Sequence, residues 1–307
     1  MRKEESRIVL SASRRTDIPA FYMDWFTARL EHGSVEIVNP YNRKMTIVDV
    51  RPDRVHSIVF WSKNYGPFLK GSYGERLMKM GYSLFFNFTL NSRQILLEPG
   101  IPSLESRLNQ LDELSLRFGS GNIYWRFDPI CFFRVGNGPI KNNLNDFPLI
   151  ADRAGDAGIL TCITSFMDQY NKVRRRINHP DLEGFSFVEE SFEHQLEILL
   201  EMEKSLAYRG ISLSICCEKE LFKALPGDSR ILPSSCIPTP LLVTRFGGNP
   251  SLKADPGQRK EKGCGCFIST DVGSYRSHPC LNECLYCYAN PSDHISNHYI
   301  PKERGAA

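Results

Sequence analysis

The chain lacks any long uninterrupted run of apolar residues, at its start or further along. A secretory signal peptide and a membrane-spanning helix both need such a run. The sequence therefore favours a cytoplasmic protein with no membrane partner. Because thiols stay reduced in that compartment, clustered cysteines indicate metal or redox chemistry instead of a disulfide framework.

The sequence also lacks a strong excess of charge of one sign. Its 38 Lys and Arg residues stand against 35 Asp and Glu, which leaves a formal net charge of +3. Dedicated nucleic-acid-binding domains usually carry a larger basic excess, so a nucleic-acid partner is only weakly supported. The basic run at 172–176 (KVRRR) has two interpretations, a nucleic-acid patch or a solvated helix face, and the small net charge favours the second.

No internal repeat or low-complexity tract is present, and 307 residues suffice for one large α/β domain or two smaller ones. Short apolar segments alternate with helical patterns, of which 104–118 is the clearest. We expect strands at 7–13, 35–39, 57–61, 84–89, 123–127, 159–163 and 211–215. Such alternation indicates an α/β fold of parallel βαβ units. Seven units suit a (β/α) TIM-like barrel, complete or incomplete, better than a smaller open sheet.

The periodic pattern fades after about residue 230, where Pro, Gly and Cys dominate. We therefore predict two parts. Residues 1–230 form the barrel core, and residues 231–307 form a cysteine-rich C-terminal cap that packs on it around a metal or iron–sulfur centre.

Polar residues follow the predicted strands, and barrel chemistry gathers at the carboxyl ends of strands. The predicted substrate-binding residues are Ser13, Arg14, Arg15, Asp17, Asn39, Trp61, Lys63 and Asn64. The candidate catalytic residues are Arg126, Asp128, Cys217 and Glu218. Cations and carboxylates around one barrel mouth would suit an anionic substrate. The alternative at each position is a structural ion pair or a solvated side chain.

Half of the ten cysteines lie in the last 44 residues. Cysteines used only for packing scatter through a core, so this clustering indicates a metal or iron–sulfur site. Cys280, Cys284 and Cys287 follow a C-x3-C-x2-C spacing. A three-cysteine run can leave one iron of a cubane cluster without a protein thiolate.

Structural zinc remains an alternative for this run, because Cys264, Cys266 or His278 would supply the fourth ligand that zinc requires. Four further thiols, Cys217, Cys236, Cys264 and Cys266, are also numerous enough for a second iron–sulfur cluster or a zinc site. Cys131 and Cys162, which lie within apolar runs, are expected in the core.

The spacing Cys280-x3-Cys284-x-Tyr286-Cys287 resembles the cluster motif of the radical S-adenosylmethionine (SAM) enzymes, and 284–289 (CLYCYA) is similar to their spore-photoproduct-lyase-like branch. The whole chain more closely resembles an uncharacterised bacterial domain-of-unknown-function family with a radical-SAM-type cysteine cluster at its C-terminus. The segments that carry this resemblance are 11–19 (SASRRTDIP), 60–64 (FWSKN), 125–129 (WRFDP), 257–259 (GQR) and 264–266 (CGC).

The resemblance implies a [4Fe-4S] cluster on Cys280, Cys284 and Cys287, with SAM at the open iron. It implies reductive cleavage of SAM to a 5′-deoxyadenosyl radical, which acts on a substrate at the barrel mouth, and an electron donor such as a ferredoxin or flavodoxin. Cys217 would be the first thiol to test as a hydrogen-atom donor. Two alternatives remain: a zinc-stabilised, non-catalytic binding module, and an iron–sulfur electron-transfer or redox protein without SAM.

Overall fold

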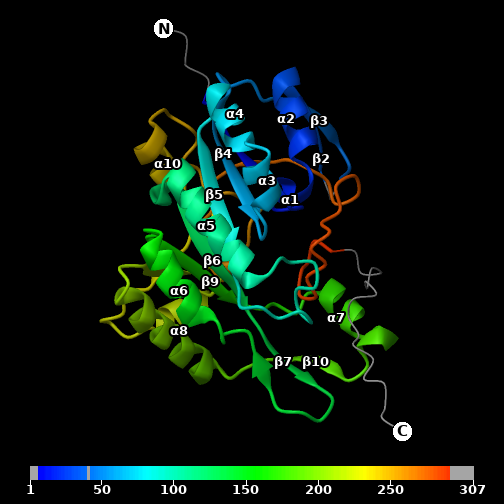
Figure 1. The fold of residues 1–307 in the computed structure, drawn as a ribbon, viewed down its shortest axis with the longest axis vertical. Helices are drawn as coiled ribbons and strands as arrows, with labels where there is room; N and C mark the ends of the chain where they lie inside the picture. Colours follow the sequence, from blue (N-terminus) through cyan, green and yellow to red (C-terminus); the bar gives the residue numbers. More distant parts are fainter. Residues whose placement is uncertain (1–5, 40–41, 291–307) are drawn as a thin grey trace.

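The computed structural model describes residues 6–39 and 42–290 (Figure 1). Residues 291–307 of the predicted cap lie outside the described part, as do residues 1–5 and 40–41 of the predicted core. The helices are α1 (Ile18–Phe21), α2 (Met23–His32), α3 (Gly66–Lys70), α4 (Tyr73–Lys79), α5 (Leu104–Phe118), α6 (Phe147–Asp156), α7 (Asn171–Ile177), α8 (Phe192–Ala207), α9 (Lys219–Ala224) and α10 (Thr239–Phe246).

One large sheet of eight strands forms the centre of the molecule. In spatial order its strands are β12 (Leu232–Pro233), β11 (Ser212–Ile215), β9 (Thr161–Phe166), β6 (Ile123–Ile130), β5 (Leu84–Thr89), β4 (Val55–Ser62), β1 (Ile8–Ala12) and β13 (Thr270–Asp271). Every neighbouring pair is parallel. The prediction of an α/β fold with a large parallel sheet is therefore confirmed.

The central strands are buried on both faces, which explains their nearly continuous apolar sequences. In β4 every residue except Trp61 is buried, and in β5 every residue except Thr89 is buried. The strands of a parallel sheet have nearly continuous apolar sequences because helices cover both faces of the sheet. The predicted strands at 57–61 and 84–89 thus fall on the most protected part of the sheet.

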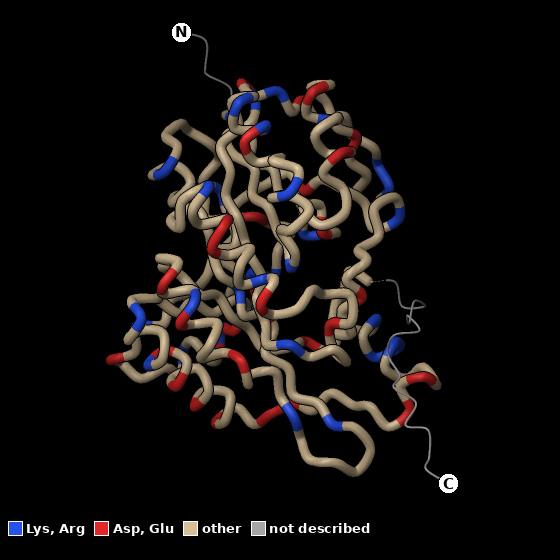
Figure 2. The backbone as a smooth tube through the Cα atoms, in the orientation of Figure 1, with Lys and Arg blue, Asp and Glu red and all other residues tan. Residues whose placement is uncertain are grey.

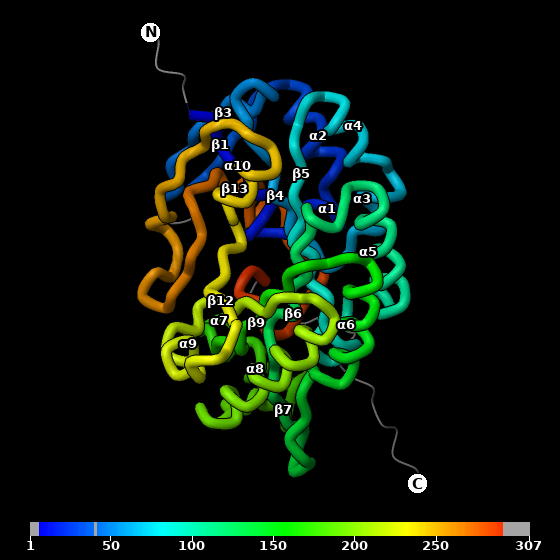
Figure 3. Tube along the Cα trace, turned by 90° about the vertical axis from the view of Figure 1, so that its left-hand side faces the viewer, coloured from blue at the N-terminus to red at the C-terminus, as the bar shows by residue number. Residues whose placement is uncertain are grey.

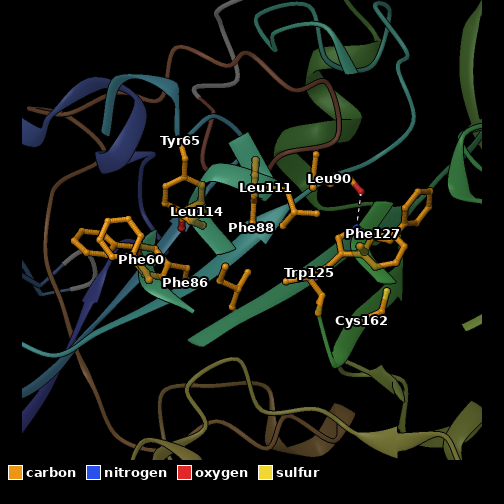
Figure 4. Packing of buried hydrophobic residues seen from close by; sticks show 14 of the residues in the cluster. Phe60, Tyr65, Phe86, Phe88, Leu90, Leu111, Leu114, Trp125, Phe127 and Cys162 are labelled. Carbon is orange, nitrogen blue, oxygen red and sulfur yellow. Dashed lines mark hydrogen bonds between the residues drawn. The ribbon is translucent and has the colours of Figure 1, made fainter. Parts of the chain in front are cut away.

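Aromatic side chains from adjacent strands fill the core (Figure 4). The rings of Phe60 on β4 and Phe86 on β5 stack with their centroids 5.8 Å apart. Trp125 on β6 is fully buried and donates its indole N–H to the Leu90 carbonyl at 3.0 Å. This hydrogen bond satisfies the one polar group of the side chain, so the core gains a large ring without an unpaired donor.

The helix predicted at 104–118 forms as α5 and packs against this core. Ser103 caps it by accepting a hydrogen bond from the Ser106 N–H at 3.2 Å, and Gly119, with φ +84°, ends it. Its buried stripe consists of Leu108, Leu111, Leu114 and Phe118, together with Arg107 and Gln110. The period of this stripe is what the sequence predicted.

Two smaller sheets lie outside the central one. The strand predicted at 35–39 forms as β2 (Ser34–Val38), but it pairs antiparallel with β3 (Met45–Asp49) in a separate two-stranded sheet. Its assignment to a barrel unit was wrong. The reason is that only Val35 of β2 is fully buried, so this strand suits a hairpin with one open face. The third sheet joins β10 (Phe185–Val188), β7 (Phe132–Val135) and β8 (Lys141–Asn142).

The eight strands do not form a closed barrel within the described residues, because β12 and β13 stand at opposite edges of the sheet without pairing. Both edge strands come from the cysteine-rich part of the chain after residue 230. One backbone hydrogen bond, from the Phe267 N–H to the Ile237 carbonyl at 3.3 Å, joins the segments that carry them. Figure 3 shows this yellow and orange part of the chain lying across the face turned to the viewer.

Charged residues of both signs are intermixed over the described part of the chain (Figure 2). No helix there is both long and apolar enough to cross a membrane.

Candidate functional site

A cavity of about 280 Å³ lies where the carboxyl ends of the central strands meet the C-terminal segment. Side chains that follow parallel strands gather at one edge of a sheet, which explains why residues distant in sequence line it together. The predicted site residues among its lining are Ser13, Arg14, Trp61, Lys63, Arg126, Asp128, Cys217, Cys236, Cys264, Cys266 and Cys287. The lining also includes Cys216, Asp168, Arg259, Tyr286 and Tyr288, which the sequence did not single out as substrate-binding or catalytic.

Other predicted substrate-binding residues do not line this cavity. Arg15 forms an ion pair with Asp271 at 3.3 Å. Asn64 accepts a hydrogen bond from the Gly66 N–H at the start of α3, at 3.0 Å. Asn39 directly follows β2 and is exposed.

Glu218 lines a neighbouring cavity that also contains Asp168 and Lys262. Its carboxylate accepts a hydrogen bond from the Phe166 N–H at 2.9 Å. Burial raises the pKa of Glu218 to about 7. The Glu218 side chain thus accepts a hydrogen bond from the backbone at the end of β9.

One arginine donates hydrogen bonds to backbone carbonyls in and next to the cysteine loop, residues 280–287. Arg176 on α7 donates to the carbonyls of Leu285 at 2.5 Å, Cys287 at 3.1 Å and Asn290 at 3.1 Å. Its side chain is only 1% exposed. Figure 1 shows α7 beside the red end of the described chain.

The basic run at 172–176 is therefore divided between two environments. Lys172, Arg174 and Arg175 are exposed, as the solvated-face interpretation predicts, whereas Arg176 is buried with Val173. The signal that could have separated them is the three-residue spacing from Val173, which puts Arg176 on the same face of the helix.

The aromatic residue of the cysteine motif is anchored through its hydroxyl. Tyr286 donates to the carboxylate of Glu98, which also accepts from Lys63 Nζ at 2.8 Å and Asn91 Nδ2 at 2.9 Å. Burial alone would raise the pKa of Glu98, but the charges of Lys63 and Arg107 outweigh it and hold this pKa below its usual range. Glu98 is therefore an ionised acceptor that fixes Tyr286 next to the cavity.

A second buried carboxylate ties the cysteine loop to the start of the chain. Asp17 accepts hydrogen bonds from Ser62 Oγ at 2.6 Å, the Lys63 N–H at 3.0 Å and Asn282 Nδ2 at 2.8 Å. It also caps α1 through the Ala20 N–H. Burial raises the pKa of Asp17. This predicted substrate-binding residue therefore positions the loop.

Gly100 allows the chain to pass directly under the cysteine loop. A Cβ at this position would lie 2.7 Å from the Leu281 carbonyl oxygen and 2.9 Å from that of Asn282. The Leu285 N–H donates to the Leu97 carbonyl at 2.8 Å in the same region. The loop thus rests on backbone at 97–100 and leaves no room for a side chain at position 100.

Five thiols from three segments form what we call the cysteine ring. Cys216 Sγ lies 3.7 Å from Cys217 Sγ and 3.9 Å from Cys236 Sγ. The side chain of Cys264 interacts with Cys217, that of Cys266 interacts with Cys236, and the two interact with each other. Sequence reasoning selected four of these residues and missed Cys216.

A buried guanidinium borders the cysteine ring. Arg126 Nη1 donates to Cys236 Sγ at 2.6 Å, and Arg126 also forms an ion pair with Asp128. Burial opposes its charge, but the negative partners outweigh this and raise the pKa of Arg126 well above its usual value. Asp128 accepts a further hydrogen bond from Ser165 Oγ. The ion pair thus joins two residues of β6 itself, at the cavity wall, and does not join β6 to a neighbouring strand.

All ten cysteines are free thiols. Burial raises the pKa of Cys280 to about 12 and that of Cys284 well above its ordinary value, so both are protonated at neutral pH. In residues 6–39 and 42–290, no three or more His, Cys, Asp or Glu side chains form a group that could hold a metal ion as they stand. The clustered thiols are nevertheless the donors that soft metals prefer, and they are compatible with metal binding once deprotonated.

Comparison with known proteins identifies one sequence family. The family described as "Domain of unknown function (DUF1848)" matches residues 9–289. No curated protein matches the chain.

Two solved structures show a weak likeness. One is the carboxyl transferase domain of Rhizobium etli pyruvate carboxylase with pyruvate, with 14% identity and a TM-score of 0.37; the match covers 90% of this chain and 43% of that one. The other is a sugar phosphate isomerase/epimerase from Parabacteroides distasonis, with 9% identity and a TM-score of 0.33; the match covers 94% of this chain and 93% of that one. The chain thus spans less than half the length of the first.

Proposed function

The chain belongs to the family described as Domain of unknown function (DUF1848), and from this premise we propose that it is an iron–sulfur enzyme of radical-SAM type. Cys280, Cys284 and Cys287 would hold a [4Fe-4S] cluster, and an anionic substrate would bind in the adjacent cavity. The observation that carries the proposal is that Cys287 and Tyr286, from the cysteine motif, line the same cavity as Arg14, Lys63 and Arg126.

The residues present fit such a cluster by their chemistry. Three thiols in one short loop match the donor type and the tight spacing of cluster ligands. Because they number three, one iron would keep an open position for SAM. When bound, the cluster would supply the single electron that cleaves the C5′–S bond of SAM, and a ferredoxin or flavodoxin would replace that electron.

The cationic side chains of the cavity would bind and orient the anionic groups. Burial alone would lower the pKa of Arg14 and of Lys63, but attraction from negative partners, chiefly Asp271 and Glu98, outweighs it and raises both, so both stay charged. Arg259 lines the same cavity and pairs with Asp168. A guanidinium offers a carboxylate or phosphate two parallel hydrogen bonds, which fixes the orientation of the bound group.

The remaining candidate residues have narrower proposed roles. Cys217 lines the cavity, so it remains the thiol to test as a hydrogen-atom donor. Arg126 and Asp128 would orient the substrate, and Glu218 would support the chain beside Cys217. Ser13 and Trp61 would contribute contacts from the ends of β1 and β4, whereas Arg15, Asp17, Asn39 and Asn64 would act on substrate only through their neighbours.

For the architecture we propose an incomplete (β/α) TIM-like barrel that is open between β12 and β13. Residues 1–230 would supply its core, and the cysteine-rich residues 231–307 would complete one side and cover the mouth. The order of the eight parallel strands supports this interpretation. The protein would act in the cytoplasm, where its thiols stay reduced.

The first test is metal and sulfide analysis of protein purified without oxygen, followed by electron paramagnetic resonance of the reduced protein with and without SAM. We expect iron, acid-labile sulfide and a reduced-cluster signal that changes when SAM is added. A signal indifferent to SAM would mean electron transfer or redox sensing. Zinc without sulfide would mean a non-catalytic, zinc-stabilised binding module.

The ligand assignment is tested by Cys284→Ala, which should remove the iron and the sulfide together with the visible absorption of the cluster. Cys162→Ala is the matched control, because Cys162 is also fully buried but lies on β9 away from the cysteine loop. Full iron content in Cys284→Ala would refute the assignment.

A further inference from the structure

We propose that the cysteine ring is a second metal centre, in which four of its five thiolates bind one zinc ion. It is separate from the proposed iron–sulfur cluster, although both line the same cavity. Each centre can therefore be present without the other, and the two proposals can fail independently.

The distances between sulfur atoms support a single small ion. Zinc binds thiolates at about 2.3 Å in a tetrahedron, which puts neighbouring sulfurs about 3.8 Å apart. Cys216 Sγ lies 3.7 Å from Cys217 Sγ and 3.9 Å from Cys236 Sγ. Thiolates of a cubane cluster must lie farther apart, because each one binds a different iron.

The backbone brings these thiols together at some conformational cost. Cys217 has φ +62°, in the left-handed region that residues other than glycine seldom occupy. A Cβ on Gly265 would lie 2.6 Å from the Ser234 carbonyl oxygen. The Cys264–Cys266 segment can therefore approach the backbone of Ser234 only because a glycine separates its two cysteines. The first feature brings Cys217 onto the ring next to Cys216, and the second brings Cys264 and Cys266 onto it together.

Positive charge borders the ring at several points. Arg126 Nη1 already donates to Cys236 Sγ at 2.6 Å. Arg14 and Arg259 interact electrostatically with Cys266 and Cys217. Four thiolates around Zn²⁺ carry a net charge of −2, and these guanidinium groups, of which that of Arg126 is buried, would balance this charge, as hydrogen-bonding partners around metal ligands commonly do.

Binding requires a small rearrangement that can be written as a balanced step. Four neutral thiols lose their protons to solvent as four Zn–S bonds form, with no change in oxidation state. The side chains then close on the ion from their present positions, in which no group holds a metal within the described residues. Because all four positions are taken by protein, the centre would be structural, and one thiol would remain free in the cavity.

The position of the ring indicates what the zinc would do. Cys216 and Cys217 follow β11, Cys236 follows β12, and Cys264 and Cys266 precede β13. The ion would thus join the two edges of the open sheet, beside the backbone hydrogen bond from the Phe267 N–H to the Ile237 carbonyl. In the strand order β4 and β5 lie inside the sheet, whereas β12 and β13 form its edges. The ion would therefore close the part of the cavity wall that lies between the two edges.

The test measures zinc, iron and sulfide in three forms of the whole protein: the natural sequence, a Cys264→Ser/Cys266→Ser double variant, and Cys284→Ala. We expect about one zinc per chain in the natural protein. The double variant should lose this zinc and keep iron and sulfide, whereas Cys284→Ala should lose iron and sulfide and keep zinc. Zinc retained in the double variant, or iron and sulfide lost there in place of zinc, would overturn the proposal.

Two further measurements guard against a variant that fails to fold. X-ray absorption at the zinc edge of the natural protein should show four sulfur neighbours at about 2.3 Å. Nitrogen or oxygen neighbours, or no zinc at all, would overturn the assignment. Gly265→Ala should also lower the zinc content without removing a ligand, and its matched control is Gly227→Ala, where a Cβ would meet no atom within 4 Å.

Discussion

At the scale of single residues, the site depends on buried charged groups that act on backbone. Arg176 donates to carbonyls of the cysteine loop, and Asp17 and Glu98 accept hydrogen bonds from Asn282 and Tyr286 within it. Buried charges are stable only when such partners satisfy them. The cysteine loop is therefore held in position by protein groups that are not themselves proposed metal ligands.

Replacing Arg176 with Met should lower both the iron content and the stability of the protein. The change keeps the length of the side chain but leaves loop carbonyls without their donor, and each unsatisfied buried group costs about 1–3 kcal/mol. Iron content and the free energy of unfolding in urea would measure the two effects. Arg175→Met, at the exposed neighbouring position, is the control. Unchanged iron content in Arg176→Met would show that the loop does not need this arginine.

At the scale of elements, the important contact is between the cysteine loop and the segment that precedes α5. Gly100 and Leu97 lie directly against the loop backbone. The same segment carries Glu98, which holds Tyr286. The connection between β5 and α5 thus supports both the backbone and the aromatic residue of the motif.

Gly100→Ala should displace the cysteine loop although it changes no proposed ligand. The added Cβ would overlap two backbone carbonyl oxygens that cannot rotate away, and overpacking of this kind costs about 1–3 kcal/mol. We expect a lower iron content and a lower midpoint of thermal unfolding. Gly227→Ala should change neither quantity, since its Cβ would be in open space. Equal behaviour of the two variants would contradict the described contact.

At the scale of the whole molecule, a buried histidine joins segments that lie far apart in the sequence. His56 on β4 bonds through Nε2 to the Gly247 carbonyl at 2.7 Å, across 191 residues of sequence, and through Nδ1 to Ser57 Oγ at 3.1 Å. Burial lowers the pKa of His56, and the charge of Arg7 adds to this effect. The folded protein therefore prefers the neutral imidazole.

This preference predicts a loss of stability in mild acid. A histidine with a lowered pKa in the folded state binds its proton more readily when unfolded, so its contribution is complete above the unfolded pKa of about 6.5 and declines as the pH falls below it. The free energy of unfolding would be measured from about pH 7.5 to about pH 5 in steps of about half a unit. Over this range it should fall less steeply in His56→Gln than in the natural protein. His32→Gln, at an exposed position at the end of α2, is the control. Identical slopes in His56→Gln and the natural protein would exclude this role.

The sequence by itself determined the elements that are buried on both faces and the helix with a regular apolar stripe. The strands at 57–61 and 84–89 and the helix at 104–118 could be predicted because burial of one element leaves a periodic mark within that element. The order of strands and helices then implied a parallel sheet whose carboxyl ends share one edge.

Tertiary structure alone decided which distant groups meet. The pairing of β2 with β3 in a separate hairpin, the burial of Arg176 and the inclusion of Cys216 in the cysteine ring all depend on partners far away or on another face. The opening of the sheet between β12 and β13 has the same origin. A local pattern records how much of an element is buried but not what covers it, because that choice is made by packing between segments that the sequence does not bring side by side.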